Sequence, residues 1–338
     1  MPTYDWHSKR VFVTGATGLV GAWLVKELVR QGAYCVVLMH DCDPQSELIR
    51  SGTLDEVTVV NGALENFNSL ERAINEQEIQ TVFHLGAQPI VSVAHRNPLP
   101  TFETNIRGTY NLLEACRIHN SMVKSVIIAS SDKAYGESAI LPYTEDMPLA
   151  GKHPYEVTKS CTDLIAQSYA HTYNLPIAIA RCGNIFGGGD LNWSRIIPGV
   201  IRSFLRGESP IIRSDGTYIR DYIYVEDVAL AYLTLAEWMT SKIAGQGFNF
   251  SPERPLTVLE LTNMIAKVMR TENIKPTILN QACGEIKSQY LDSTKALEQL
   301  DWKPKFTIEA GLEKTVEWYR DFFSKQTNQS TMQLYGRK

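Results

Sequence analysis

The chain has 338 residues, which corresponds to about two domains at a typical size of roughly 150 residues each. A composition of 44% hydrophobic and 21% charged residues excludes wholesale disorder. The net charge of −4 gives no electrostatic reason to expect a nucleic-acid or anionic-membrane partner, and no apolar stretch of the sequence is long enough to cross a bilayer.

Short β-branched runs alternate with longer amphipathic stretches in the first half of the chain. The runs predict strands at residues 10–14, 34–39, 56–60, 81–85, 123–129 and 177–181. The stretches between them predict helices at 19–31, 69–77, 100–119 and 154–174. Strands separated by such helices form βαβ units, so we expect an α/β fold with a doubly wound parallel sheet and helices on both faces.

A glycine-rich turn, GATGLVG, joins the first predicted strand to the first predicted helix. Its glycines permit a tight turn, let backbone N–H groups approach a pyrophosphate, and allow the helix to pack closely on the strand. The helix N-terminus also favours an anion. This context predicts a dinucleotide site in a Rossmann-type fold. The expected cofactor contacts in the turn are Gly15, Thr17, Gly18, Leu19, Val20 and Gly21.

An acidic residue at the end of the second strand predicts which dinucleotide binds. Asp41 lies about 20 residues after Gly21, where an acid hydrogen-bonds the ribose of NAD and repels the 2′-phosphate of NADP. His40 beside it leaves NADP open as an alternative, so NAD is the predicted cofactor.

A tyrosine and a lysine open the helix predicted at 154–174. The i, i+4 spacing of Tyr155 and Lys159 places the phenol and the ammonium on one helical face. The ammonium, together with a cationic nicotinamide, would lower the pKa of the Tyr155 phenol so that it acts as a base near neutral pH. Ser131, at the carboxyl end of the strand predicted at 123–129, adds a hydroxyl at the sheet edge where ligands bind in such folds.

These features resemble the extended short-chain dehydrogenase/reductases, the NAD-dependent epimerases and dehydratases that act on nucleotide-diphosphate sugars. The matching stretches, in order, are TGATGLVG, HLGAQ, ETNIRGTYNLLEA, SSDKAYG, YEVTK, RCGNIFGGGD and RDYIYVEDVA. They extend over about residues 9–322. One departure is Gly62-Ala63, where many members of the group carry Gly-Asp and the aspartate contacts adenine.

The resemblance implies roles for residues outside the glycine turn. Ser131 would hydrogen-bond the sugar 4-hydroxyl, Tyr155 would remove its proton, and Lys159 would hold the nicotinamide ribose. Further cofactor contacts are implied at Leu85 and Ala87. Sugar-nucleotide contacts are implied at Gln88, Asn105, Asn184, Arg195 and Arg220.

Two residues after Ser131 indicate which reaction follows oxidation at C4. Asp132-Lys133 resembles the form found in CDP-glucose 4,6-dehydratases, in which water is lost across C5 and C6. Asp132 would protonate the departing C6 oxygen, and Lys133, if neutral, would take the C5 proton. The product would be a nucleotide-linked 4-keto-6-deoxyhexose for deoxysugar or surface-glycan synthesis.

Two alternatives remain open at this stage. A sugar-nucleotide 4-epimerase needs only Ser131, Tyr155 and Lys159, and a non-catalytic nicotinamide-binding protein is disfavoured by the intact tyrosine–lysine pair. Arg220-Asp221-Tyr222 is the general form of the group rather than that of the CDP-glucose enzymes, so the nucleotide base stays open.

The predicted organisation interleaves two domains. Residues 1–182, with a returning segment near 218–248, would bind NAD, and residues 183–217 and 249–325 would bind the sugar nucleotide. The polar, aperiodic tail at 326–338 is expected to fray. The helices predicted at 100–119 and 154–174 have more apolar positions than one buried face requires and match those that form a dimer interface in the group, which predicts a homodimer.

Cysteines and the N-terminus indicate where the protein works. Six scattered cysteines without a C-x-x-C pair suggest neither a metal site nor a disulfide framework. MPTYDWHSKR has no apolar segment after its charges, so a secretory signal is not expected. We therefore predict a soluble, cytoplasmic protein.

Overall fold

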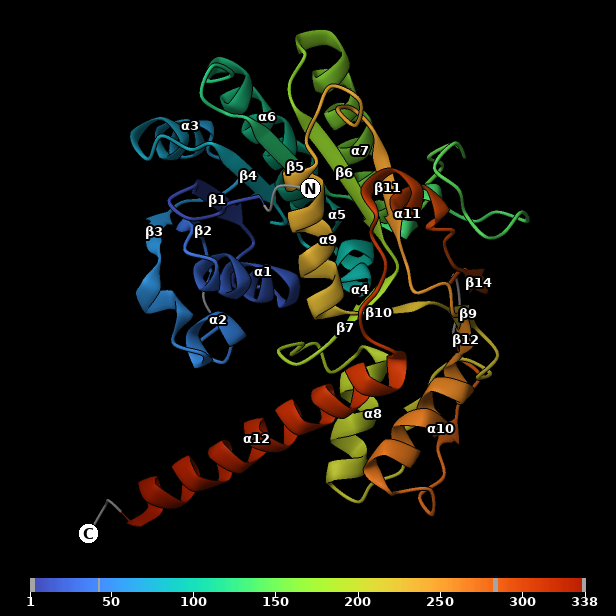
Figure 1. The fold of residues 1–338 in the computed structure, drawn as a ribbon. Helices are drawn as coiled ribbons and strands as arrows, with labels where there is room; N and C mark the ends of the chain where they lie inside the picture. The colour runs from blue at the N-terminus through green and yellow to red at the C-terminus, as the bar shows by residue number, and fades with distance from the viewer. Residues whose placement is uncertain (1–3, 42, 282–284, 336–338) are drawn as a thin grey trace.

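A seven-stranded parallel sheet forms the centre of the molecule (Figure 1). The computed structural model describes residues 4–41, 43–281 and 285–335. The strands are β1 (Arg10–Thr14), β2 (Tyr34–Met39), β3 (Thr58–Asn61), β4 (Thr81–His84), β5 (Ser125–Ala129), β6 (Ile177–Cys182) and β11 (Gly247–Phe250). Their order in the sheet is β11-β6-β5-β4-β1-β2-β3, so the strand order reverses between β1 and β4, where doubly wound sheets bind ligands. The predicted Rossmann-type fold is confirmed.

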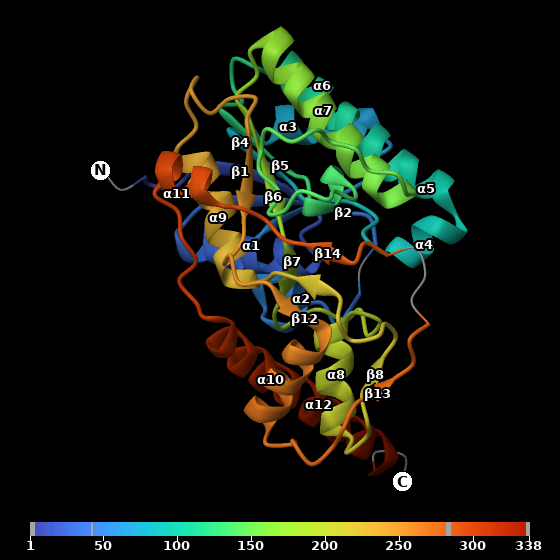
Figure 2. The same cartoon turned by 90° about the vertical axis from the view of Figure 1, so that its right-hand side faces the viewer.

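Helices cover both faces of this sheet (Figure 2). α1 (Leu19–Arg30) and α9 (Val225–Glu237) pack together on one face, and α3 (Phe67–Glu76), α6 (Gly108–Ile118) and α7 (Pro154–Tyr173) lie on the other. Alternation along β1 explains the division, because Val11 and Val13 join the apolar cluster with α1 whereas Phe12 joins that with α3 and α6.

The helix predicted over 100–119 is confirmed as an uninterrupted helical stretch from Pro98 to Ile118 that contains a π turn. It consists of α5 (Pro98–Phe102), the π-helical turn η2 (Glu103–Arg107) and α6, and follows the short α4 (Val91–Arg96). The strand predicted at 56–60 starts later, because η1 (Thr53–Glu56) is a 3₁₀ turn. A π turn inserts one extra residue, which the 3.6-residue periodicity of the sequence does not reveal.

The second half of the chain builds a smaller helical layer below the sheet in both views (Figures 1 and 2). Its helices α8 (Ile196–Leu205), α10 (Val258–Met269) and α12 (Ile308–Tyr335) surround a separate apolar cluster, and α11 (Thr294–Leu300) lies beside β11. Its short strands are β7 (Asn184–Phe186), β8 (Ile211–Ile212), β9 (Ile219–Arg220), β10 (Tyr222–Tyr224), β12 (Leu256–Thr257), β13 (Thr277–Ile278) and β14 (Ser288–Gln289). β7 pairs with β10, and β9 lies between β12 and β14.

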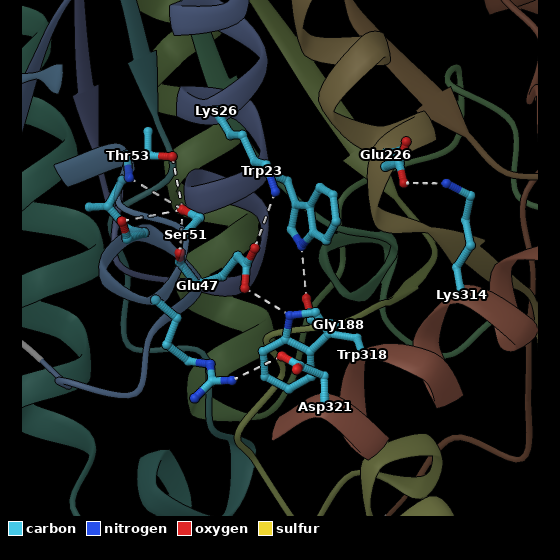
Figure 3. Close-up of polar contacts among 12 residues, drawn as sticks. Trp23, Lys26, Glu47, Ser51, Thr53, Gly188, Glu226, Lys314, Trp318 and Asp321 are labelled. Carbon is cyan, nitrogen blue, oxygen red and sulfur yellow. Dashed lines mark hydrogen bonds and ion pairs between the residues drawn. The ribbon is translucent and has the colours of Figure 1, made fainter. Parts of the chain in front are cut away.

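Hydrogen bonds donated by two tryptophan side chains and one lysine join the two layers (Figure 3). Trp318 of α12 donates to Glu47 of α2 (Glu47–Arg50) over 2.7 Å, and Lys26 of α1 donates to the same carboxylate over 3.3 Å. Trp23 of α1 donates to the Gly188 carbonyl over 2.8 Å. Because Glu47 is buried and both of its oxygens have donors, it fixes α12 against α1 and α2.

The backbone of α12 is helical as far as Tyr335, within the tail for which we predicted fraying. Between Gly311 and Gly336 the sequence has no glycine or proline to end the helix, and fraying itself stays a prediction. Within the described residues, no helix combines the length and the apolar character that a membrane crossing requires.

Candidate active site

The glycine turn after β1 is packed closely against the loop after β4. Gly15 has a φ of +73°, and a Cβ there would lie 2.6 Å from the Gly86 nitrogen. A Cβ at Gly21 would lie 2.1 Å from the Gly15 carbonyl oxygen. Gly18 is the N-cap of α1, so the turn presents the free N–H groups of a helix start. This side-chain-free cradle at a helix N-terminus fits the pyrophosphate of a dinucleotide.

His84, at the end of β4, is a buried structural residue. Its Nδ1 lies 2.8 Å from Thr14 Oγ1 and its Nε2 lies 3.1 Å from Thr109 Oγ1, while the Gly86 N–H also donates to Thr14 Oγ1 over 3.0 Å. Burial, with the nearby Lys159 charge, lowers the pKa of His84 to about 3. The neutral ring therefore holds the loop containing Leu85 and Ala87 next to the glycine turn.

Gln88 and Asn105, both expected to contact substrate, bind each other. The Gln88 N–H donates to Asn105 Oδ1 (2.7 Å), and Asn105 Nδ2 donates to the Gln88 carbonyl (3.2 Å) and to Thr158 Oγ1 (2.9 Å). Asn105 is only 2% exposed and lies in the π turn. Because Thr158 lies between Tyr155 and Lys159 on α7, Asn105 braces the helix that carries them, and a direct substrate contact stays a prediction.

The segment after β5 forms a buried ion pair. It is a 3₁₀ turn, η3 (Asp132–Tyr135), capped by Ser131. Ser131 Oγ donates to Asp132 Oδ1 and Lys133 Nζ donates to Asp132 Oδ2, each over 2.9 Å. Asp132 is 1% exposed and the Lys133 side chain 20%. The carboxylate is thus withdrawn from water and the ammonium mostly so, unlike a solvated pair on a surface loop.

Tyr155 and Lys159 lie beside this turn. Lys159 is 6% exposed, its Nζ donates to the Ala129 carbonyl over 2.7 Å, and burial lowers its pKa to about 8. Burial raises the pKa of Tyr155 to about 12, although the Arg195 charge and a hydrogen bond with Ser131 lower it. The pKa of the phenol in the chain alone is therefore higher than the sequence analysis expected, and the lowering by a cationic nicotinamide stays a prediction.

The other three residues expected to contact the sugar nucleotide, Asn184, Arg195 and Arg220, come from the second half of the chain. Arg195 is the N-cap of α8, and its Nη1 donates to Asp190 Oδ2 over 3.1 Å. Asn184 Nδ2 donates to the Asp221 carbonyl over 3.3 Å. The Arg220 guanidinium donates to backbone carbonyls on β9 and in the loop before β14, namely those of Ile219, Ile286 and Lys287.

The Asp41 carboxylate, two residues after β2, is exposed to solvent. Its side chain is 94% exposed, and its Oδ2 lies 3.8 Å from His40 Nε2. Ala63 stands where the resemblance implied an adenine-contacting aspartate. It lies just after β3, the strand next to β2 in the sheet. The ribose contact of Asp41 stays a prediction.

Two buried residues close to η3 were given no role by the sequence analysis. Asp221 is fully buried, accepts from Ser251 Oγ and from the Leu291 N–H (3.0 Å), and has its pKa raised to about 7 by burial and the nearby Asp132 carboxylate. Gln289 donates to the Asp132 carbonyl over 3.1 Å. Asp221 lies in a recognised motif, whereas no sequence signal marks Gln289. Among the described residues, no cluster of His, Cys, Asp or Glu could hold a metal ion.

Comparison with known proteins relates this geometry to a family. Residues 11–250 match the NAD dependent epimerase/dehydratase family. The chain is 31% identical over 336 residues to the CDP-glucose 4,6-dehydratase of Salmonella typhimurium, covering 93% of this chain and 91% of that protein. The structure resembles that of the UDP-glucose 4-epimerase of Thermotoga maritima with UDP-glucose, at a TM-score of 0.84 and 28% identity over 93% of this chain and 99% of the other. It also resembles the dTDP-glucose 4,6-dehydratase of Bacillus anthracis in complex with NAD, at a TM-score of 0.82 and 25% identity over 93% and 97%.

Proposed function

Since the chain belongs to the NAD-dependent epimerase/dehydratase family, we propose that it is a nucleotide-diphosphate hexose 4,6-dehydratase. The observation that carries this proposal is the buried Asp132–Lys133 ion pair directly beside the Ser131 hydroxyl. An epimerase has no proton to move at C5 or C6, so it has no chemical use for this pair.

The first step is proton removal at the 4-hydroxyl. NAD held by the glycine turn between Gly15 and Gly21 would supply hydride acceptance at C4 and hydride return at C6, so the reaction would have no net redox change. Tyr155 takes the hydroxyl proton, and Ser131 orients that hydroxyl through a hydrogen bond. Lys159, held on the Ala129 carbonyl, supplies positive charge behind the phenol and binds the nicotinamide ribose.

The second step is loss of water, which needs one acid and one base. Moving one proton from Lys133 Nζ to Asp132 Oδ2, across their 2.9 Å contact, converts the ion pair into a neutral amine and a carboxylic acid. The amine then takes the C5 proton, made acidic by the C4 ketone, and the acid protonates the departing C6 oxygen. When the hydride is returned to C6, Lys133 gives the same proton back to C5. Tyr155 then releases the proton of the 4-hydroxyl to solvent and Lys133 takes one up, so the three side chains end in the protonation states in which they began.

The sugar nucleotide is proposed to lie across the junction of the two layers. Arg195 and Arg220 would face the diphosphate and Asn184 the neighbouring part of the substrate, because guanidinium groups bind phosphate oxygens well. The Arg195 charge lowers the pKa of the Tyr155 phenol, which supports a position of this guanidinium on the substrate side of the site.

A 4-epimerase is the second candidate, because a UDP-glucose 4-epimerase shares this fold over 93% of the chain. Incubation with CDP-, UDP-, GDP- and dTDP-hexoses separates the two. A dehydratase releases a product lighter by one water with a 4-keto group, whereas an epimerase releases a sugar of unchanged mass. The same panel identifies the nucleotide base.

We also propose a homodimer through α6 and α7. Four large apolar side chains on these helices are 41–53% exposed, namely Tyr110, Ile118, Leu164 and Tyr173. Covering these side chains with a second copy of the same face would remove them from water.

A further inference from the structure

A short segment of the second layer, residues 286–291, contacts the turn η3 (Asp132–Tyr135), which we call the catalytic turn. It contains β14, which pairs with β9 in parallel. The Ile219 N–H donates to the Lys287 carbonyl (2.9 Å), and the Leu291 N–H donates to the buried Asp221 carboxylate (3.0 Å). These bonds fix both ends of the segment, so its central residue Gln289 is held in place.

Gln289 reaches from this segment to the catalytic turn. It is 0% exposed, and its Nε2 donates to the Asp132 carbonyl oxygen over 3.1 Å. That carbonyl belongs to the peptide that joins Asp132 to Lys133. Fixing this peptide therefore sets the direction in which both side chains leave the backbone.

The other half of the Gln289 amide is unused. Its Oε1 is buried without a hydrogen-bond partner among the described residues. An unpaired buried acceptor is unfavourable, and an apolar side chain of the same length would fill the space without it. The N–H side of the amide thus makes its polar contacts, to the Asp132 carbonyl over 3.1 Å and to the Tyr143 phenol, whose pKa it lowers.

We infer that Gln289 is a positioning residue for the Asp132–Lys133 pair and acts on the loss of water but not on C4 oxidation. This inference rests on the proposed function. The Arg220 guanidinium binds the carbonyls of Ile286 and Lys287, so the same segment also connects the expected diphosphate contact with the catalytic acid.

The test replaces Gln289 by Met, which keeps the length of the side chain and removes the donor. Ser293→Ala is the matched control, because it removes another buried hydrogen bond, to the Ser251 carbonyl (3.3 Å), two residues beyond the segment. Both changes are made in the parent and in an Asp132→Asn, Lys133→Met background, and circular dichroism establishes that each variant folds. If Gln289→Met does not fold, Gln289→Leu takes its place.

In the parent background we expect Gln289→Met to slow water loss about tenfold or more, as expected for a misplaced catalytic group, with reduced cofactor accumulating and KM unchanged. In the Asp132→Asn, Lys133→Met background we expect less than about a twofold further effect, because residues that act through one another are not additive. Ser293→Ala should change neither step.

Each other outcome overturns the inference. A similar loss in both backgrounds would assign Gln289 a merely structural role, and parental water loss in Gln289→Met would show that the hydrogen bond does not matter. If the parent enzyme itself releases no product lighter by one water from any of the four nucleotide sugars, the proposed function fails and the inference fails with it. The parent reaction thus separates the two failures.

Discussion

Neutralising the Asp132–Lys133 pair separates the two half-reactions. In the Asp132→Asn, Lys133→Met variant, Ser131, Tyr155 and Lys159 are unchanged, so C4 oxidation should proceed close to the parental rate. Water loss should slow by on the order of 10² to 10⁴, the usual contribution of a positioned acid or base. That range corresponds to about 3–5 kcal/mol of transition-state stabilisation.

The double change is preferred because the pair is buried. Lys133→Met alone leaves the Asp132 carboxylate, 1% exposed, with the Ser131 hydroxyl as its one remaining side-chain donor among the residues that the structure describes. An uncompensated buried charge of this kind destabilises a fold by about 3–5 kcal/mol, whereas removing both charges is close to neutral. Urea unfolding should therefore show a large loss for the single variant and a small one for the double variant.

The assay follows absorbance of the dihydronicotinamide after mixing enzyme with the nucleotide sugar that the parent accepts. The double variant should accumulate reduced cofactor, and Tyr155→Phe should show none. An Arg72→Met, Glu76→Gln variant, which neutralises an exposed pair on α3 with atoms 4.0 Å apart, controls for the loss of an ion pair as such. Product release by the double variant at the parental rate would refute the catalytic role of the pair. The 4-epimerase hypothesis would then be favoured.

Asp41→Asn should raise the affinity of the apo-protein for NADP relative to NAD, measured by titration calorimetry, and tighter NADP binding by the parent would contradict the role of Asp41. Leu164→Asp should convert a sedimenting dimer into a monomer at micromolar concentration, whereas Leu297→Asp, an equally exposed leucine on α11, should not. His84→Gln should make the stability of the fold less sensitive to acid. The pKa of His84 is lowered to about 3 in the folded protein and is about 6.5 in the unfolded chain, so between these two values the unfolded chain binds a proton that the folded protein does not. The free energy of unfolding of the parent should therefore fall by about 1.4 kcal/mol for each pH unit below 6.5 because of this residue. Urea unfolding at a series of pH values measures this. If the free energy of unfolding falls with pH equally steeply in parent and variant, the prediction is contradicted.

Local signals in the sequence account for the sheet and the glycine turn. The turn from Gly15 to Gly21 is recognisable because its requirement, backbone without side chains between a strand and a helix, is itself a sequence property. Strand β1 was predicted with its observed ends because a run such as RVFVT is buried on both faces.

Long-range contacts explain what the sequence did not reveal. Asn105 faces inward because the π turn shifts the helix register, and the partners that stabilise this shift, Gln88 and Thr158, are distant in sequence. Gln289 reaches Asp132 across 157 residues, through a two-residue strand with no alternation to recognise. Such contacts depend on how the two layers dock, which no local pattern encodes.

Electrostatics link the two proposed steps through Asp132. Burial raises the pKa of Tyr155 to about 12, the Arg195 charge lowers it, and the Asp132 carboxylate raises it further. When a proton moves from Lys133 to Asp132, that negative charge disappears, and the pKa of the Tyr155 phenol falls. The state in which Asp132 can donate a proton to the C6 oxygen is therefore also a state in which the Tyr155 phenol more readily loses its own proton and becomes available as the base for the 4-hydroxyl. An ionisable pair at this position is useful where a proton has to be held and then delivered, which is the requirement of a dehydratase.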